Sequence, residues 1–193
     1  MPEYRPLNDA EIAALQRLSD ETYAILKEKR PSAVRALNAY TNAKTEKHKL
    51  INGVLRGGSN VSKEDKREVK VKKYVRYIDL AIKKFKSPFG ATVYCGTEAE
   101  YYKSWNVGDV RRKKDYLSTS VKKSVAEIFL RSKENDGKEP LLLEIFIPEG
   151  VRGIYIGKNT AYDKNESEFL LGRGLRYKVL ERFDRTLRLE VLP

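Results

Sequence analysis

The sequence predicts an α+β fold, with helices in the first half of the chain and short strands in the second. Apolar residues repeat at helical spacing up to the turn at 87–90, and beyond it they form short β-type runs. Gly, Pro, Asn and Asp residues separate these runs. We therefore expect one domain over residues 1–193, with a helical part over 1–87 and a β-rich core of two mostly antiparallel sheets over 88–193.

The first part of the chain carries the signals of three helices. Asn8 and Glu11 have the spacing of a capping box, which predicts a helix over 9–29. Residues 34–40 suit a second, short helix. Thr45 is placed to cap a third helix, which two consecutive glycines should end.

A fourth helix is expected to begin near Ser62 and Asp65. Its apolar residues recur at alternating spacings of four and three, which is typical of a helix with one buried face. They are Val71, Val75, Ile78, Ile82 and Phe85. Beyond them we expect a helix over 122–131 and strands over 91–96, 116–120, 141–147, 153–156, 168–171, 177–183 and 187–192.

Composition limits the classes of partner and site. A net charge of +12 suits nucleic acid, an anionic membrane face, an acidic protein or a phosphate-rich ligand, or serves solubility alone. The single cysteine, Cys95, excludes an intramolecular disulfide. With the single histidine, His48, which we place at the surface, it argues against a metal site.

The N-terminus does not have the pattern of a signal peptide. No apolar stretch approaches the roughly 20 residues that span a bilayer. We therefore expect a protein without a membrane segment, which is made in the cytoplasm and acts there or is delivered into a target cell.

Two carboxylates, Glu166 and Glu168, stand one residue apart and lead into an apolar run. On a strand, side chains at i and i+2 share a face. Two carboxylates on one face repel each other, and this repulsion can raise the pKa of one of them. Such an arrangement is poor for stability and useful for chemistry, although the motif by itself also fits two exposed acids at the start of a strand.

Two further motifs precede the acidic pair. The hydroxyls of Ser118-Thr119-Ser120 can donate hydrogen bonds to a carboxylate or a ribose, or can cap the helix that follows. The run Tyr94-Cys95-Gly96 suggests a strand that ends at a glycine, where the backbone can approach a ligand closely.

Taken in this order, the three motifs resemble those of the Arg-Ser-Glu class of mono-ADP-ribosyltransferases, which includes iota-toxin-like enzymes and related bacterial and phage proteins. The resemblance covers roughly residues 30–185 and extends to 143–150 and 170–174. It implies the ADP-ribosyltransferase fold, with N-terminal helices packed on a two-sheet core. It also implies transfer of ADP-ribose from NAD to a protein side chain. That family binds NAD without a Gly-rich dinucleotide motif, and this sequence has none.

The resemblance also assigns roles to residues. Glu168 would bond a ribose hydroxyl and stabilise positive charge, Ser118 would hold Glu168, and Glu166 would orient the acceptor. In the family, Glu at the place of Glu166 goes with arginine targets, so the resemblance implies an arginine acceptor on a target protein. The turn over 157–165 would present Tyr162 to that protein. The remaining residues expected to bind NAD are Asn52, Arg56, Tyr94, Cys95, Gly96, Thr119, Ser120, Phe129 and Arg131.

One position departs from the family pattern. The family has an arginine that contacts the NAD diphosphate where this chain has Cys95, and a thiol cannot form charge-assisted hydrogen bonds to phosphate. Another basic residue could replace the arginine, with Arg56, Arg111 and Arg131 as candidates. Alternatively, the residue is engineered, the chain is a weakened or inactive relative, or the register differs. A reactive thiol is a further reading, although a cysteine in a strand is more often inert.

Three functions follow from these observations. The first is an arginine-specific mono-ADP-ribosyltransferase in a toxin, effector or phage setting. The second is a non-catalytic or weakened NAD-binding relative with the same fold. The third is a basic nucleic-acid-binding protein, whose affinity would depend steeply on salt. The basic tract at 111–114 could draw NAD or an acidic target, and we expect it in a solvated loop.

Overall fold

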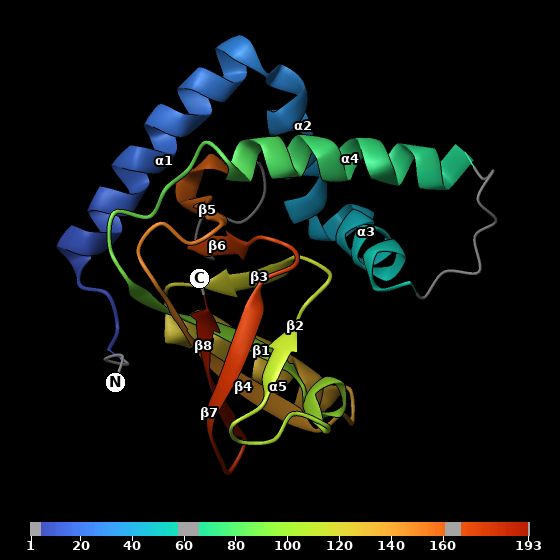
Figure 1. Ribbon diagram of the computed structural model, residues 1–193, viewed down its shortest axis with the longest axis vertical. Coiled ribbons are helices and arrows are strands. Elements are labelled where there is room, and N and C mark those ends of the chain that lie inside the picture. The colour runs from blue at the N-terminus through green and yellow to red at the C-terminus, as the bar shows by residue number, and fades with distance from the viewer. Residues whose placement is uncertain (1–4, 58–65, 161–166, 193) are drawn as a thin grey trace.

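The computed structural model describes residues 5–57, 66–160 and 167–192. Within these ranges four α-helices lie in the N-terminal part of the chain and the strands follow, with a fifth α-helix between the third and the fourth strand, as Figure 1 shows. The helices are α1 (Asp9–Lys29), α2 (Pro31–Thr41), α3 (Lys47–Arg56), α4 (Lys66–Ile82) and α5 (Lys123–Asn135), with short 3-10 helices η1 (Ala43–Thr45), η2 (Ala99–Tyr102) and η3 (Gly157–Asn159). The α+β class is therefore confirmed.

The strands join in one hydrogen-bonded order, β2-β7-β8-β4-β1-β3-β6-β5. They are β1 (Ala91–Glu98), β2 (Val110–Arg112), β3 (Leu117–Ser120), β4 (Pro140–Ile147), β5 (Gly153–Tyr155), β6 (Glu168–Leu171), β7 (Arg176–Phe183) and β8 (Thr186–Leu192). Only β4 and β8 pair in parallel among the described strands, so the expectation of a mostly antiparallel core is confirmed.

The sheet has two halves that meet at a narrow junction. Strands β1 and β3 share a single pair in register, Tyr94 with Ser120, whereas β1 pairs with β4 along its whole length. The two sheets expected from the sequence are thus β2-β7-β8-β4-β1 and β3-β6-β5, joined at one point. This junction brings together the middle of β1, the end of β3 and the start of β6.

The helices pack on different parts of the sheet. Helices α1 and α4 contact β5, while α5 packs against β1 and β4 and also contacts β3 (Figure 1). A large buried cluster runs from α1, α2 and α4 through the β3-β6-β5 half and on into β1, β4, β7 and β8, and it contains Leu15, Ile78, Phe169 and Val179. A smaller cluster under α5 holds Tyr94, Ala126 and Leu142.

The ends of the first helices test the capping expectations. The amide of Glu11 donates to Asn8 Oδ1 and the amide of Asn8 donates to Glu11 Oε2, both at 2.9 Å, so the capping box of α1 is confirmed. Thr45 does not cap α3, and that expectation is wrong. Its hydroxyl instead donates back to the carbonyls of Ala39 and Asn42 near the end of α2, and α3 begins after Glu46, which adopts a left-handed conformation.

The buried face of α4 is confirmed, because Val71, Ile78 and Ile82 are buried. The proposed start at Ser62 and Asp65 lies outside the described residues. The sequence reading missed strand β2, because a strand of three residues is too short to show alternation. Arg111 and Arg112, expected in a solvated loop, belong to this strand and pair with β7.

No helix in the described parts of the chain is long and apolar enough to cross a membrane.

Candidate active site

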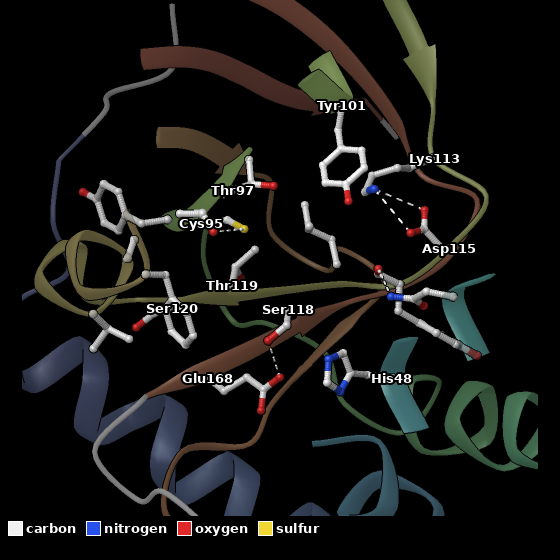
Figure 2. Close-up of a pocket in the computed structure, with 18 of the residues that line it drawn as sticks. His48, Cys95, Thr97, Tyr101, Lys113, Asp115, Ser118, Thr119, Ser120 and Glu168 are labelled. Atoms are coloured by element: carbon white, nitrogen blue, oxygen red, sulfur yellow. Dashed lines mark hydrogen bonds and ion pairs between the residues drawn. The ribbon is translucent and has the colours of Figure 1, made fainter. Parts of the chain in front are cut away.

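A cavity of about 450 Å³ opens where β1, β3 and β6 meet, beside α3, α5 and η2. Figure 2 shows its wall, with side chains from all of these elements. The lining includes hydroxyls, aromatic rings, two cations and two carboxylates. The residues are Tyr40, Thr41, His48, Asn52, Arg56, Tyr94, Cys95, Gly96, Thr97, Tyr101, Tyr102, Trp105, Lys113, Asp115, Tyr116, Leu117, Ser118, Thr119, Ser120, Val125, Ala126, Phe129 and Glu168.

Strand pairing places a carboxylate beside a serine in this wall. Glu168 lies opposite Ser120 in the register of β6 and β3, and Ser118, two residues along, shares the same face. The Ser118 hydroxyl donates to Glu168 Oε1 at 2.6 Å (Figure 2). Glu168 is only 6% exposed, so this hydrogen bond fixes a carboxylate that has lost most of its water.

The backbone at the start of β6 explains where Glu168 emerges. Ser167 has a φ of 48°, a left-handed conformation that is uncommon for a residue other than glycine. The Ser167 carbonyl accepts from the amide of Val121 at 3.2 Å. The chain therefore turns immediately before Glu168, and the strand begins with its side chain at the cavity.

Helices α2 and α3 form the adjacent wall through one asparagine. Asn52 Nδ2 donates to the Tyr40 hydroxyl at 2.9 Å and to the Tyr116 carbonyl at 3.2 Å. The Tyr40 and Tyr116 rings meet edge to face, with centroids 5.6 Å apart. Burial raises the pKa of the Tyr40 phenol far above its usual range, and the charge on Glu168 adds to this rise. Tyr40 is therefore a neutral hydroxyl near the carboxylate.

Strand β1 brings Cys95 and Gly96 to the cavity. Burial raises the pKa of the Cys95 thiol to about 11, so the thiol is protonated at neutral pH. A Cβ on Gly96 would lie 2.3 Å from the carbonyl oxygen of Ala126 in α5. The glycine is thus needed for helix packing, and the strand does not end there as expected but continues to Glu98.

Comparison with known families agrees with this geometry. A family model described as ADP-ribosyltransferase exoenzyme matches residues 16–188. The chain belongs to the ADP-ribosyltransferase exoenzyme family.

Relatives in this family include the NAD(+)–arginine ADP-ribosyltransferase EFV of Enterococcus faecalis, which is 35% identical over 193 residues. The alignment covers 99% of this chain and 36% of that protein, so this chain spans about a third of the relative's length. The C3 exoenzyme of Clostridium limosum matches with a TM-score of 0.74 at 18% identity, covering 100% of this chain and 98% of that one. The toxin Plx2a of Paenibacillus larvae matches with a TM-score of 0.72 at 22% identity, and both chains are covered completely. These structures confirm the expected fold.

Most residues that the resemblance assigned to the site surround the cavity of this family member. Asn52, Arg56, Tyr94, Cys95, Gly96, Ser118, Thr119, Ser120, Phe129 and Glu168 line it. Arg131 is exposed on α5 and does not line the cavity. Arg111 does not line it either, because its guanidinium pairs with Asp109 at 2.7 Å. Of the three expected replacements for the missing arginine, only Arg56 therefore reaches the cavity.

Two expected residues, Glu166 and Tyr162, lie outside the described residues. The turn expected over 157–165 is described only as far as residue 160. Its beginning is fastened to α1, where Gln16 Oε1 accepts from the Lys158 amide at 3.0 Å and Asp20 Oδ1 accepts from Asn159 Nδ2 at 2.8 Å.

Among the lining residues that the sequence did not lead us to expect at the site are His48, Lys113 and Asp115. His48, expected at the surface, is half-buried on α3 with its ring edge to face against Tyr40. Burial lowers the pKa of His48, and the charge on Lys49 lowers it further. Lys113 and Asp115 come from the loop between β2 and β3. The polar run before Tyr116 carried no periodic signal that distinguishes a cavity wall from a solvated loop.

The residues of the cavity fit a dinucleotide. Its volume lies within the range of small-molecule and cofactor sites. Phe129 and Tyr101 offer aromatic surfaces, Ser118 and Thr119 offer hydroxyls, and Arg56 offers a cation for phosphate. Among the described residues, no group of three His, Cys, Asp or Glu side chains converges as a metal site would require.

Proposed function

We propose that this chain is an NAD-dependent mono-ADP-ribosyltransferase that modifies arginine side chains of a target protein. The observation that carries the proposal is the buried Glu168 carboxylate, held by Ser118 at 2.6 Å in the wall of a dinucleotide-sized cavity. Membership of the ADP-ribosyltransferase exoenzyme family supports the transfer reaction. The name of the relative EFV supports arginine as the acceptor.

Glu168 acts on the bond between nicotinamide and ribose. NAD supplies the ADP-ribosyl group, and the electron pair of the breaking bond leaves with nicotinamide. The ribose carbon then gains positive charge, as in glycoside hydrolysis. A carboxylate fixed beforehand stabilises that charge without reorganising, which is commonly the largest contribution to catalysis. Ser118 holds the carboxylate in position.

Glu166 prepares the acceptor in this proposal. A guanidinium is protonated and is a poor nucleophile. A carboxylate beside it orients one nitrogen and accepts its proton as the new bond to the ribose carbon forms. The placement of Glu166, two residues before Glu168, supports this role. Tyr162 would contact the target protein.

The other expectations have less support. The setting as a toxin or effector stays a prediction, as does delivery into a target cell, and nothing here favours binding to nucleic acid. The alternative of a non-catalytic relative is favoured by one observation, the neutral thiol of Cys95 where the family has an arginine. The same assay separates it from the enzyme.

The assay uses labelled NAD with agmatine, which carries a guanidinium, or putrescine, an amine without one. We expect nicotinamide release and label on agmatine but not on putrescine. Glu168→Gln should lower the rates of both signals by about 10²–10³. Glu21→Gln, which changes an exposed acid on α1, is the matched control and should leave both intact. Absence of nicotinamide release from the unaltered chain, or a labelling rate that Glu168→Gln leaves unchanged, overturns the proposal.

A further inference from the structure

Cys95 occupies the position in β1 where the family pattern has an arginine, so one end of the cavity lacks that guanidinium. Cys95 lies in the wall, its thiol is protonated, and its Sγ is 3.8 Å from the Gly96 carbonyl oxygen. A neutral thiol makes no charge-assisted hydrogen bond to a phosphate. If the chain binds a dinucleotide there, positive charge must come from another element.

Lys113 reaches the same cavity from the loop between β2 and β3. Its backbone is fixed on both sides, because its amide donates to the Leu175 carbonyl at 3.0 Å and its carbonyl accepts from the Gly174 amide at 2.6 Å. Its side chain is only 17% exposed. This lysine is therefore held against the cavity by two backbone hydrogen bonds, unlike a lysine on a solvated loop.

Asp115 and Tyr102 fix the position of the Lys113 ammonium. Lys113 Nζ lies 3.2 Å and 3.4 Å from the two carboxylate oxygens of Asp115 and 5.9 Å from the centre of the Tyr102 ring. Figure 2 shows the ammonium facing this carboxylate. Burial raises the pKa of Cys95, and the positive charge of Lys113 partly opposes this rise. The charge of Lys113 is therefore felt where the Cys95 thiol lies.

The single carboxylate of Asp115 lies within ion-pair distance of two cations, Lys113 and Arg56. It is 3% exposed, and Arg56 Nη1 lies 3.6 Å from its Oδ2. Lys113, Arg56 and Asp115 together leave a surplus of one positive charge at this end of the cavity. An ammonium has three donors, so Lys113 keeps one for an anion while two face Asp115.

We propose that Lys113, positioned by Asp115, binds the diphosphate of the dinucleotide in place of the guanidinium that Cys95 cannot supply. The inference rests on the proposed function, because it assumes that the cavity takes NAD. A lysine contacts phosphate as a point charge, whereas an arginine contacts it through two parallel hydrogen bonds. The substitution therefore preserves charge and gives up the bidentate geometry.

The experiment measures binding of ADP-ribose, which has the diphosphate, and of adenosine, which lacks it, by calorimetry. Lys113→Met should weaken ADP-ribose binding by about tenfold or more, as expected for a lost hydrogen bond to a charged group. Adenosine binding should not change. Lys114→Met is the matched control, because Lys114 is exposed on the same loop and does not line the cavity, and it should leave both affinities unaltered.

Two further variants separate an anion contact from a structural role. Lys113→Arg should keep ADP-ribose binding, because it keeps the charge. Cys95→Arg should restore ADP-ribose binding in the Lys113→Met chain. In the unaltered chain Cys95→Arg should change the ADP-ribose affinity by less than about threefold, because Lys113 already supplies the cation. A gain of tenfold from Cys95→Arg alone would mean that Lys113 does not fill the role, and it overturns the inference even if Lys113→Met fails to fold.

The remaining outcomes distinguish this inference from the proposed function. If the unaltered chain binds ADP-ribose and releases nicotinamide from NAD, but Lys113→Met binds ADP-ribose as well as Lys114→Met does, only the role of Lys113 is overturned. An equal loss of ADP-ribose and adenosine binding in Lys113→Met also overturns it, because the damage is then general. If the unaltered chain neither binds ADP-ribose nor acts on NAD, both proposals fall.

Discussion

The two ends of the cavity are built in different ways. Ser118 and Glu168 lie on the paired strands β3 and β6, where register alone places them on one face. Lys113 and Asp115 lie on a loop that two backbone hydrogen bonds of Lys113 attach to Gly174 and Leu175, just before β7. The end that holds Ser118 and Glu168, which we call the strand end, is fixed by regular structure. The end that holds Lys113 and Asp115, which we call the loop end, is fixed by contacts between segments far apart in the chain.

The chemistry of the two ends differs as well. At the strand end a neutral hydroxyl orients a single buried carboxylate. At the loop end two cations share one carboxylate, Asp115. The strand end is therefore suited to stabilising positive charge, and the loop end to holding negative charge. This polarity matches a substrate whose ribose becomes positive while its diphosphate stays negative.

The largest effect is expected at the strand end. Glu168→Gln keeps the size of the side chain and removes its charge, so it should lower kcat for nicotinamide release by about 10²–10³. ADP-ribose affinity, which depends on the loop end, should stay within a few-fold. Kinetics and calorimetry on the same preparation check both values. A parallel loss of affinity would show that the two ends do not have separate roles.

The thiol at the loop end should be nearly inert. Because burial raises the pKa of Cys95 to about 11, its thiolate fraction at pH 8 is about 100-fold below that of a thiol with an ordinary pKa near 9. Alkylation by iodoacetamide should therefore be slower than that of a free thiol by about this factor. The rate should rise tenfold per pH unit until the pH approaches 11. Mass spectrometry after timed labelling measures the rate, and fast labelling at pH 8 would restore the reading of a reactive cysteine.

Ser118→Ala tests the support of the carboxylate. Losing a hydrogen bond to a charged group should lower kcat by about 10- to 100-fold, less than the loss of Glu168 itself. Ser118→Thr, which keeps a hydroxyl, should recover most of the rate. Because Ser118 acts through Glu168, its removal should add little to the loss in a Glu168→Gln chain. Additive losses would mean that the serine acts on the substrate independently.

The same contrast explains what the sequence could predict. The motif Ser118-Thr119-Ser120 and the acid Glu168 were recognisable through their resemblance to a family pattern, and alternation on a strand predicted which of their side chains share a face. The capping box of Asn8 and Glu11 and the buried face of α4 followed from equally local rules. Each of these patterns involves only residues that lie close together in the sequence.

The loop end could not be predicted in this way. Lys113 reaches the cavity only because Gly174 and Leu175, some sixty residues later, hold its backbone. His48 faces the cavity because α3 packs beside Tyr40. Thr45 failed as a cap because carbonyls near the end of α2 compete for its hydroxyl. In each case the deciding contact comes from tertiary packing, which no local pattern records.

The smallest effect is expected at Tyr116, which lies between the two ends. Its hydroxyl donates to Asp79 Oδ1 at 2.7 Å, and its ring packs on Tyr40. Tyr116→Phe keeps the ring, and Arg173 still pairs with Asp79, so no buried charge is left alone. The free energy of unfolding should fall by about 1 kcal/mol, which lowers Tm by about 2–4 °C in a chain of this size.

Thermal melts of Tyr116→Phe and of Tyr101→Phe, an exposed ring that serves as the control, measure this difference. Nicotinamide release should be unchanged in Tyr116→Phe, because neither Ser118 nor Lys113 is fastened through the Tyr116 hydroxyl. A fall in kcat together with a fall in ADP-ribose affinity would mean that α4, through Asp79, sets the geometry of both ends at once. The cavity would then behave as one unit, whereas the two modes of attachment seen here predict that its ends respond separately.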